Sequence, residues 1–442
     1  MIRLSIILLF SWQIIFAQNK TVAYKKSTIQ LGLFPGISTN GLNPGEYENL
    51  FSFNLFTGYG YSTRYFELNG LSGFNTASSS GIHISGIANF IGGNEMVGLT
   101  EKEKRKQIRN GYETNLTGFQ LAGVLNYTGA NTEGAQITVG VNNTQKYLIG
   151  AQIGGLFNYV GSFTMGTQLS LIGNYSKKSM SGVQLSLLLN TTQGSATGMQ
   201  IGAYNHAGVI NPTKGPNPST NTAMQIGIIN TTGDMGGWQI GVLNIGNRVA
   251  GTQIGIINIF KMPKPVDYKA SPAFGLLNIG GSMNPRFYVS ELYLTNYGLF
   301  TGKGLNSKVR SASRFVYSYN EIIYSTNYKQ EREIKWGASY RFGIISFTKS
   351  QDPNVWRNYF SFSTELGHYN LNKKLDNQLR MRYAAHIELG SRLSRKMSSF
   401  YPFVAFSYNY MPDAIANTPK FLATTASNGK LWAGYSVGLM IH

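Results

Sequence analysis

His386 and Glu388 are the residues whose types and spacing come nearest to acid–base chemistry in this chain. They lie two positions apart in an alternating segment, so both side chains are expected on one face of a strand. Acid–base catalysis needs a histidine within hydrogen-bond reach of a carboxylate. Charged residues in the same and in neighbouring segments are expected on equivalent water-facing positions: Arg341, Glu365, Arg380, Arg382 and Arg392. Charged side chains are ordinary where strands enclose a water-filled lumen, as in a β-barrel. The structural interpretation of this group is therefore stronger than the catalytic one.

The sequence contains no other catalytic or metal-binding pattern. Its five histidines are scattered and lack the spacing of a zinc site: His83, His206, His368, His386 and His442. With no cysteine, the chain has no disulfide, no thiolate ligand and no cysteine nucleophile. It also contains neither a Gly-x-Ser-x-Gly elbow nor a Walker loop. We therefore expect no enzyme activity, no metal and no cofactor.

The segments that carry these charges alternate between apolar and polar residues over unusual lengths. The alternation runs through 334–346, 357–369 and 379–393, whereas a strand in a soluble protein usually has about 5–6 residues. A strand that crosses a bilayer has roughly 9–11 tilted residues. The last alternating segment, 431–442, resembles the closing strand of bacterial outer-membrane barrels, although it ends in His442 rather than in an aromatic residue.

A second pattern, Gly-x-Gln-(Leu/Ile)-x-x-x-x-Asn, returns every sixteen residues from Gly118 to Gly198. Within each copy, apolar residues alternate with polar ones at a period of two, which predicts β-strands. A constant step indicates one supersecondary unit stacked on its neighbours. The residues that define the repeat are Gln120, Asn126, Gln136, Asn142, Gln152, Asn158, Gln168, Asn174, Gln184 and Asn190.

The step shortens further along the chain. Gln225, Gln239 and Gln253 follow one another at fourteen residues, and an Asn comes five rather than six positions after each Gln. An odd spacing would put Gln and Asn on opposite faces of a regular strand. Either these copies contain a bulge or their Asn has moved into the turn, and the sequence leaves both open.

The N-terminus and the charge balance predict where the protein works. Arg3, an apolar run over 4–16 and Ala17 form a secretory signal peptide over 1–17, cleaved near Ala17. The formal charge of +19 would suggest a nucleic-acid ligand in a cytosolic protein. Since the leader predicts export, we expect anionic lipid headgroups or acidic solutes instead, and no nucleic acid.

Charged and proline-rich residues lie between the repeat strands, not within them. No Asp, Glu, Lys or Arg lies between the Gln and the Asn of any copy from Gln120 to Asn258. Three segments that interrupt the pattern, 92–117, 211–221 and 261–272, are charged or rich in proline and are expected to be exposed loops.

These patterns predict an all-β fold. No later segment has the roughly twenty apolar residues of a membrane helix, so strands would have to cross as a closed barrel. We expect residues 18–442 to form a single transmembrane antiparallel barrel on the order of 16–22 strands, with a repeat region over 65–280 and non-repeat strands over 283–442. The alternative is a parallel β-solenoid followed by a small C-terminal barrel. That solenoid would bury Leu169 and Leu171 and stack Gln and Asn in ladders.

The repeats, together with the segments 31–41 and 51–55, resemble a family of surface-repeat proteins of Gram-negative bacteria that are predicted to lie in the outer membrane. The likeness covers roughly residues 28 to 300. It implies a surface or outer-membrane location and no established activity, and it transfers no functional residue.

Two function classes follow from the sequence. The first is an outer-membrane protein with a structural or surface-interaction role, whose partners are outer-membrane lipid, the barrel-assembly machinery and a surface protein. The second is a passive, weakly anion-selective pore for small anionic solutes, with a cationic lumen built from Arg341, Arg380, Arg382 and Arg392.

Overall fold

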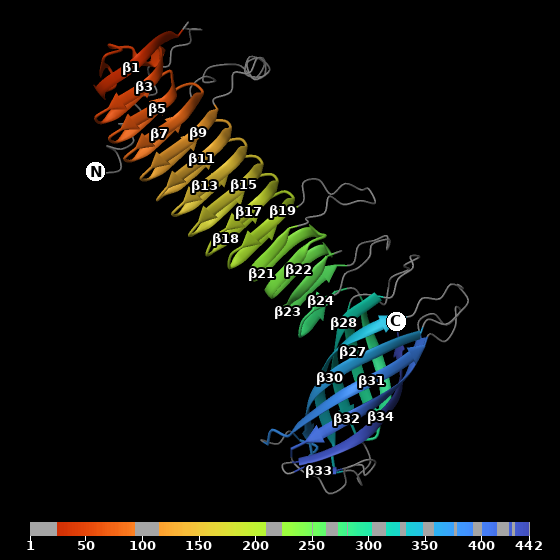
Figure 1. Ribbon diagram of the computed structural model, residues 1–442. Helices are drawn as coiled ribbons and strands as arrows, with labels where there is room; N and C mark the ends of the chain where they lie inside the picture. Colours follow the sequence, from red (N-terminus) through yellow and green to blue (C-terminus); the bar gives the residue numbers. More distant parts are fainter. Residues whose placement is uncertain are drawn as a thin grey trace, which may run out of the picture. The chain divides into compact units, whose positions relative to one another are not determined.

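The computed structural model describes residues 24–92, 115–208, 223–249, 251–261, 273–280, 282–302, 315–327, 333–347, 358–374, 378–391, 400–412, 424–426 and 429–441. These residues form two compact units, which divide between Gly227 and Ile228. Apart from the short 3-10 helix η1 (Pro44–Glu46), every regular element among them is a β-strand (Figure 1). None of the described segments is a helix long and apolar enough to span a bilayer.

The first unit is a stack of parallel coils, each made of a longer and a shorter strand (Figure 1). At the start of the stack, the short β2 (Ile37–Ser38) pairs antiparallel with β1 (Lys25–Phe34). The longer strands pair in the order β1 (Lys25–Phe34), β3 (Tyr47–Asn54), β5 (Ser62–Asn69), β7 (Ser79–Ser85), β9 (Leu116–Ala122), β11 (Thr132–Thr138), β13 (Leu148–Gly154), β15 (Thr164–Ser170), β17 (Met180–Leu185) and β19 (Ala196–Ile201). The shorter ones pair in the order β4 (Thr57–Gly60), β6 (Ser72–Asn75), β8 (Ala88–Ile91), β10 (Leu125–Thr128), β12 (Val141–Thr144), β14 (Phe157–Val160), β16 (Gly173–Ser176), β18 (Leu189–Thr192) and β20 (Tyr204–Ala207).

Successive coils stack in register, so that each repeat residue lies on its own kind. Gln136 pairs with Gln152, and Asn142 pairs with Asn158. The repeat glycine permits this approach: Gly134 has a φ of +138°, and a Cβ built on it would lie 1.9 Å from the carbonyl oxygen of Gly118. Only glycine adopts this backbone conformation without strain, which explains why a glycine opens each copy.

The coils bury their amides and expose their aliphatic side chains. Every repeat-defining Gln and Asn from Gln120 to Asn190 is at most 1% exposed. Stacked Gln and Asn ladders were predicted for the solenoid alternative and are confirmed. The expected burial of Leu169 and Leu171 is wrong: Leu171 is 57% exposed and Leu169 is half-buried. The amides occupy the interior because in-register stacking satisfies them there.

Towards the second unit, three continuous strands replace the long and short pairs, and the last coil is again divided into two short strands. β21 (Met224–Met235) begins in the first unit and ends in the second, followed by β22 (Trp238–Val249), β23 (Thr252–Lys261), β24 (Ala273–Phe274) and β25 (Leu277–Ile279). β22 and β23 pair in parallel but skip the exposed pair Val242 and Ile256. The alternation of buried and outward-facing side chains therefore shifts by one residue within β22, and Gln239 and Asn244 are both buried. Of the two alternatives for the odd spacing, a move of the Asn into the turn is excluded, because Asn244 lies within β22. The strand is irregular at Val242, but its register with β23 is the same at Gln239 and at Asn244.

The rest of the second unit is a closed antiparallel barrel of eight strands (Figure 1). The barrel strands are β26 (Ser282–Ser290), β27 (Thr295–Gly302), β28 (Phe315–Thr326), β29 (Trp336–Phe347), β30 (Asn358–Asn370), β31 (Met381–Ser391), β32 (Phe400–Met411) and β34 (Gly429–Ile441). Neighbouring strands pair in sequence order, and β34 pairs with β26 to close the barrel. The short β33 (Thr424–Ala426) pairs with β34.

The all-β prediction is therefore confirmed, and the alternative with coils plus a small barrel fits. The preferred arrangement, one antiparallel barrel over 18–442, is wrong. Its premise fails because each sixteen-residue copy breaks into strands of at most seven and four residues, shorter than the roughly 9–11 needed to cross a bilayer. The coils also begin before residue 65, since β1 and β3 already pair in parallel.

Several predicted features lie outside the described residues: the signal peptide over 1–17, most of the three interrupting segments, Arg392 and His442.

Candidate functional site

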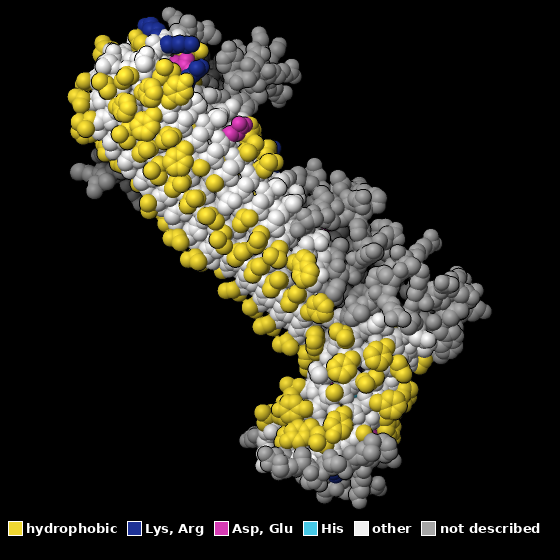
Figure 2. Space-filling model, viewed as in Figure 1, with side chains coloured by type: hydrophobic (Ala, Val, Ile, Leu, Met, Phe, Trp, Pro, Cys, Tyr) yellow, Lys and Arg dark blue, Asp and Glu magenta, His cyan; other side chains and the backbone are white. Residues whose placement is uncertain are grey.

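The outer wall of the barrel is apolar. On its strands, large hydrophobic side chains that point outward are between 41% and 61% exposed: Phe287, Val289, Ile322, Phe360, Phe362, Leu366, Ile387, Leu389, Val404, Phe406 and Val437. Figure 2 shows hydrophobic side chains over the barrel wall. They alternate with buried residues along the strands, and in β30 several of these buried residues are polar, as where Phe360 and Phe362 flank Ser361.

Inside the barrel, Arg286 joins two glutamates from opposite directions. Its Nη1 donates to Glu321 Oε2 at 2.9 Å and its Nη2 donates to Glu388 Oε2 at 2.6 Å. The other oxygen of Glu388 accepts a hydrogen bond from the Tyr359 hydroxyl at 2.6 Å. The guanidinium carbon also lies 4.0 Å from the centroid of the Phe403 ring, which adds a cation–π contact.

Strand register explains a second set of ion pairs. Glu321, Arg341 and Glu365 lie directly opposite one another on β28, β29 and β30. Arg341 therefore reaches both carboxylates, with Nη1 3.3 Å from Glu321 Oε2 and Nη2 2.8 Å from Glu365 Oε2. Arg382 pairs with the other oxygen of Glu365, and His386 Nε2 lies 3.0 Å from Glu365 Oε2.

The structure thus brings together five of the seven charged residues expected on the water-facing side: Arg341, Glu365, Arg382, His386 and Glu388. Arg380 does not join them, since it is half-buried just before β31 and donates to the side chain of Gln378. Arg392 lies outside the described residues.

The cluster is balanced and not cationic. Three arginines, Arg286, Arg341 and Arg382, pair with three glutamates, Glu321, Glu365 and Glu388, and none of the six is more than 7% exposed. The expected cationic lumen built from Arg341, Arg380, Arg382 and Arg392 is therefore not what the described residues form. Arg341 and Arg382 are neutralised because the strand register places glutamates opposite or beside them.

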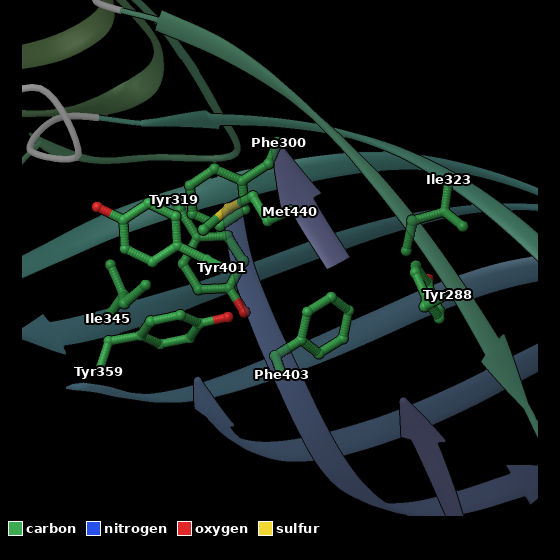
Figure 3. Close-up of a cluster of buried hydrophobic side chains, with 9 residues drawn as sticks. All are labelled: Tyr288, Phe300, Tyr319, Ile323, Ile345, Tyr359, Tyr401, Phe403 and Met440. Atoms are coloured by element: carbon green, nitrogen blue, oxygen red, sulfur yellow. The ribbon is translucent and has the colours of Figure 1, made fainter. Parts of the chain in front are cut away.

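Aromatic side chains fill much of the remaining barrel interior. Figure 3 shows one buried cluster: Tyr288, Phe300, Tyr319, Ile323, Ile345, Tyr359, Tyr401, Phe403 and Met440. Its members belong to seven different strands. A second cluster packs around Trp432 and Tyr369. The cavity between Tyr288, Arg341 and His386 has space for roughly one water molecule. An eight-stranded barrel is just wide enough for its own side chains to fill, and this one follows that rule.

Sequence reasoning missed Arg286 and Glu321, two central members of the cluster. The signal for Arg286 was present, because Phe287 and Val289 mark the outward positions of β26 and place Arg286 inward. Glu321 was harder to identify, since β28 carries aromatic or aliphatic residues on both faces, such as Tyr319 inside and Ile322 outside.

Within the second unit, the last coil ends against barrel residues. The backbone N–H of Asn278 donates to the side chain of Asn320 at 2.7 Å, and the Thr301 hydroxyl donates to the Asn278 carbonyl at 2.9 Å. Asn278 also accepts the final bond of the Asn ladder, from Asn258 at 2.7 Å. An open end of a stacked sheet exposes unpaired groups, and these contacts occupy several of them.

The first unit has a buried ion pair of its own. His83 Nδ1 lies 2.9 Å from Glu67 Oε2, and Asn69 donates to the other carboxylate oxygen at 3.0 Å. Burial by itself would raise the pKa of Glu67. The hydrogen bond and charge of His83, with the amides of Asn69 and Asn75, outweigh burial and hold that pKa below its ordinary value of 4.5.

Comparisons with protein-family models, with curated proteins and with solved structures found no match to this chain. The described residues also contain no group of three or more His, Cys, Asp or Glu side chains placed to hold a metal ion. The functional argument therefore depends on the geometry of the barrel and of the coils.

Proposed function

We propose that the protein is an exported outer-membrane protein whose β26–β34 barrel spans the bilayer as an anchor, and whose coils have a structural or surface-interaction role. The observation that carries this proposal is the polarity of the barrel. Its buried interior holds three arginines paired with three glutamates, whereas its outer wall exposes Phe360, Phe362 and Ile387.

This apolar wall is the reverse of the wall of a soluble barrel, which would face water with polar residues. In a bilayer, the apolar wall meets hydrocarbon, and closure leaves no strand edge unpaired. The barrel strands of 11 to 13 residues from β28 to β32 are long enough for the crossing. The sequence adds two supports, the leader over 1–17 and the resemblance to outer-membrane surface-repeat proteins.

We propose no pore as a second function. A passive anion pathway needs an open lumen with excess positive charge, but the described barrel residues form a balanced ion cluster and two apolar clusters. The partners that remain are outer-membrane lipid, the barrel-assembly machinery and, for the coils, a surface component.

Membrane fractionation with a gel-shift assay tests the proposal. We expect the chain in the outer-membrane fraction, resistant to urea extraction, with a folded band that shifts on boiling. Ile387→Asp should weaken this retention, because it places a charge on the lipid-facing wall. Lys373→Asp, a charge reversal in the exposed segment between β30 and β31, is the matched control and should leave retention unchanged. A monodisperse chain that stays soluble without detergent would overturn the proposal.

A further inference from the structure

The corner where each longer strand turns into its shorter strand carries large apolar side chains in the first unit. We call this edge the apolar corner and define it by Val124, Val139, Leu156, Leu171, Leu187 and Leu188, which are 57%, 75%, 48%, 57%, 68% and 51% exposed. Figure 2 shows hydrophobic side chains gathered along one side of these strands. Exposed apolar patches that continue over several repeats mark interaction surfaces.

Polarity changes in steps away from this corner. The outward residues next to it on the longer strands are all Leu or Ile, from Leu121 to Ile201. On the shorter strands, the outward column three to four positions beyond the corner, which we call the tyrosine column, contains Tyr127, Tyr159 and Tyr175 together with Asn143, Thr191 and His206. The turn after the shorter strands, at the opposite edge of each coil, carries lysine in two coils, at Lys146 and at Lys177 and Lys178, and Gln145 and Gln193 are further polar residues of these turns.

This order, aliphatic then tyrosine then lysine, is the order of groups across a membrane interface, where aromatic rings lie at headgroup level and cations reach water or phosphate. The only charged residue of β11, Glu133, lies at the end of the strand next to the polar turn and accepts a hydrogen bond from the Tyr147 hydroxyl. Ile149, Phe163 and Met165, which are 40%, 38% and 51% exposed at that edge, are departures from the pattern.

The backbone at the apolar corner is already satisfied by neighbouring coils. Val141 N donates to Val124 O at 2.8 Å, Leu156 N to Gly140 O at 3.0 Å and Leu187 N to Leu171 O at 3.1 Å. Asn side chains cap the inner side of the corner, as when Asn158 Nδ2 donates to Leu169 O at 2.6 Å. Hydrocarbon excludes backbone that lacks internal partners, and this corner meets the requirement.

The height of the apolar zone matches one leaflet. Tyr159 lies three positions after Leu156, which at about 3.3 Å per residue is roughly 10 Å. Segments that lie in a membrane interface bury their apolar side by roughly 5–10 Å, whereas the full hydrocarbon core is about 30 Å thick. The zone is deep enough to enter a leaflet and too shallow to cross the bilayer.

We propose that the apolar corner of the first unit is inserted into the hydrocarbon of one lipid leaflet, so that the repeats lie along a membrane surface. The tyrosine column then lies at headgroup level, and the lysine-bearing turn faces anionic headgroups and water. The occupant is lipid and not a second copy of the chain, because a protein partner would have no need of the stepwise change from aliphatic to tyrosine to lysine. The inference depends on residues of the first unit alone and not on the barrel spanning the bilayer.

The lack of cysteine makes a labelling test direct. Single-cysteine variants of the full chain are spin-labelled at the corner (Val139→Cys, Leu187→Cys), at the tyrosine column (Tyr159→Cys) and at the polar turn (Gln145→Cys). The probe is a vesicle of phosphatidylcholine with phosphatidylglycerol. Accessibility to oxygen, which concentrates in hydrocarbon, is compared with accessibility to a water-soluble nickel chelate. Circular dichroism confirms that each variant keeps its β-structure, and a Phe362→Cys label reports the barrel wall.

We expect the ratio of oxygen to nickel accessibility to be severalfold higher at the corner than at the polar turn, with an intermediate value at Tyr159. Corner labels as open to nickel as the Gln145 label would overturn the inference. So would corner labels that are shielded from both reagents and lose spin–spin broadening when unlabelled chain is added, because a second copy would then occupy the corner. The Phe362 label keeps the two proposals separate: if it alone reports water, the barrel proposal fails and the leaflet inference stands.

Discussion

The side-chain amide of Gln152 donates to that of Gln136 across 2.7 Å, one coil away along the stack. The next residue in each copy, Ile137 or Ile153, points outward. Each coil therefore gives its interior to amides and its surface to aliphatic side chains. Buried amides are tolerated only when they are bonded, and stacking at a constant step supplies a partner for each of them.

Replacing Gln152 by Leu should destabilise the coils. The change removes the acceptor of Gln168, whose Nε2 donates to Gln152 Oε1 at 2.9 Å, and a buried unsatisfied donor costs about 1–3 kcal/mol. Urea unfolding followed by circular dichroism in detergent measures the loss. Asn143→Leu, on the outward side of β12, is the matched control and should change stability by less than about 0.5 kcal/mol. Equal midpoints for the two variants would contradict the role of the ladder.

Replacing Arg286 by Met should destabilise the barrel by about 3–5 kcal/mol, because it leaves three buried glutamates with two arginines and so one buried negative charge uncompensated. The temperature at which the folded band disappears from a gel-shift assay measures this effect. Adding Glu388→Gln to Arg286→Met should recover part of the loss. Arg380→Met serves as the control, since Arg380 lies outside the cluster, and an equal effect there would contradict the account.

Planar-bilayer recordings should show no steady ion conductance. The reason is the filled interior, in which the clusters around Phe403 and around Trp432 accompany the balanced Arg–Glu pairs. Reproducible channels with anion preference, reduced by neutralising Arg341 or Arg382, would instead support the pore.

Glu67 should contribute an acid-sensitive part of the stability of the first unit. Because its pKa is lower in the folded chain than its ordinary value of 4.5, the stabilisation is complete above that value and is lost as the pH falls through the folded pKa. Unfolding midpoints of the natural chain and of Glu67→Gln should therefore differ at neutral pH and converge in acid. Glu133→Gln, at an exposed position of β11, should show no such convergence.

The repeat spacing predicted strands, and the alternation at 379–393 identified the inward side of the strand, which holds the buried His386 and Glu388. Strand direction could not be predicted in the same way, because a period of two is the same for parallel and antiparallel pairing. The sixteen-residue step of the repeat did contain information on strand direction. Sixteen residues per copy with a Gly at its head and apolar residues at its centre, such as Leu171 and Ile172, allow two short strands and a corner.

Hydrophobicity alone also could not predict which side chains of the coils are buried. Leu169 and Leu171 would be interior residues under the usual rule, but here Gln168 and Asn174 take the interior because their neighbours in the stack are identical amides. In the barrel, the sequence grouped five charged residues correctly. The charge of the barrel interior was predicted wrongly, because Arg286 and Glu321 lie on β26 and β28, two strands that the apolar–polar alternation in the sequence did not identify.

A labelling scan along β30 tests the central claim, that the outward apolar side chains contact lipid, most directly. Single-cysteine spin labels replace Phe360, Phe362 and Leu366 on the wall and Lys373 in the following exposed segment, in the full chain reconstituted into vesicles. We predict high oxygen and low nickel accessibility at the three wall positions and the reverse at Lys373. Nickel accessibility at Phe362 equal to that at Lys373, in a chain with intact β-structure, would contradict the account.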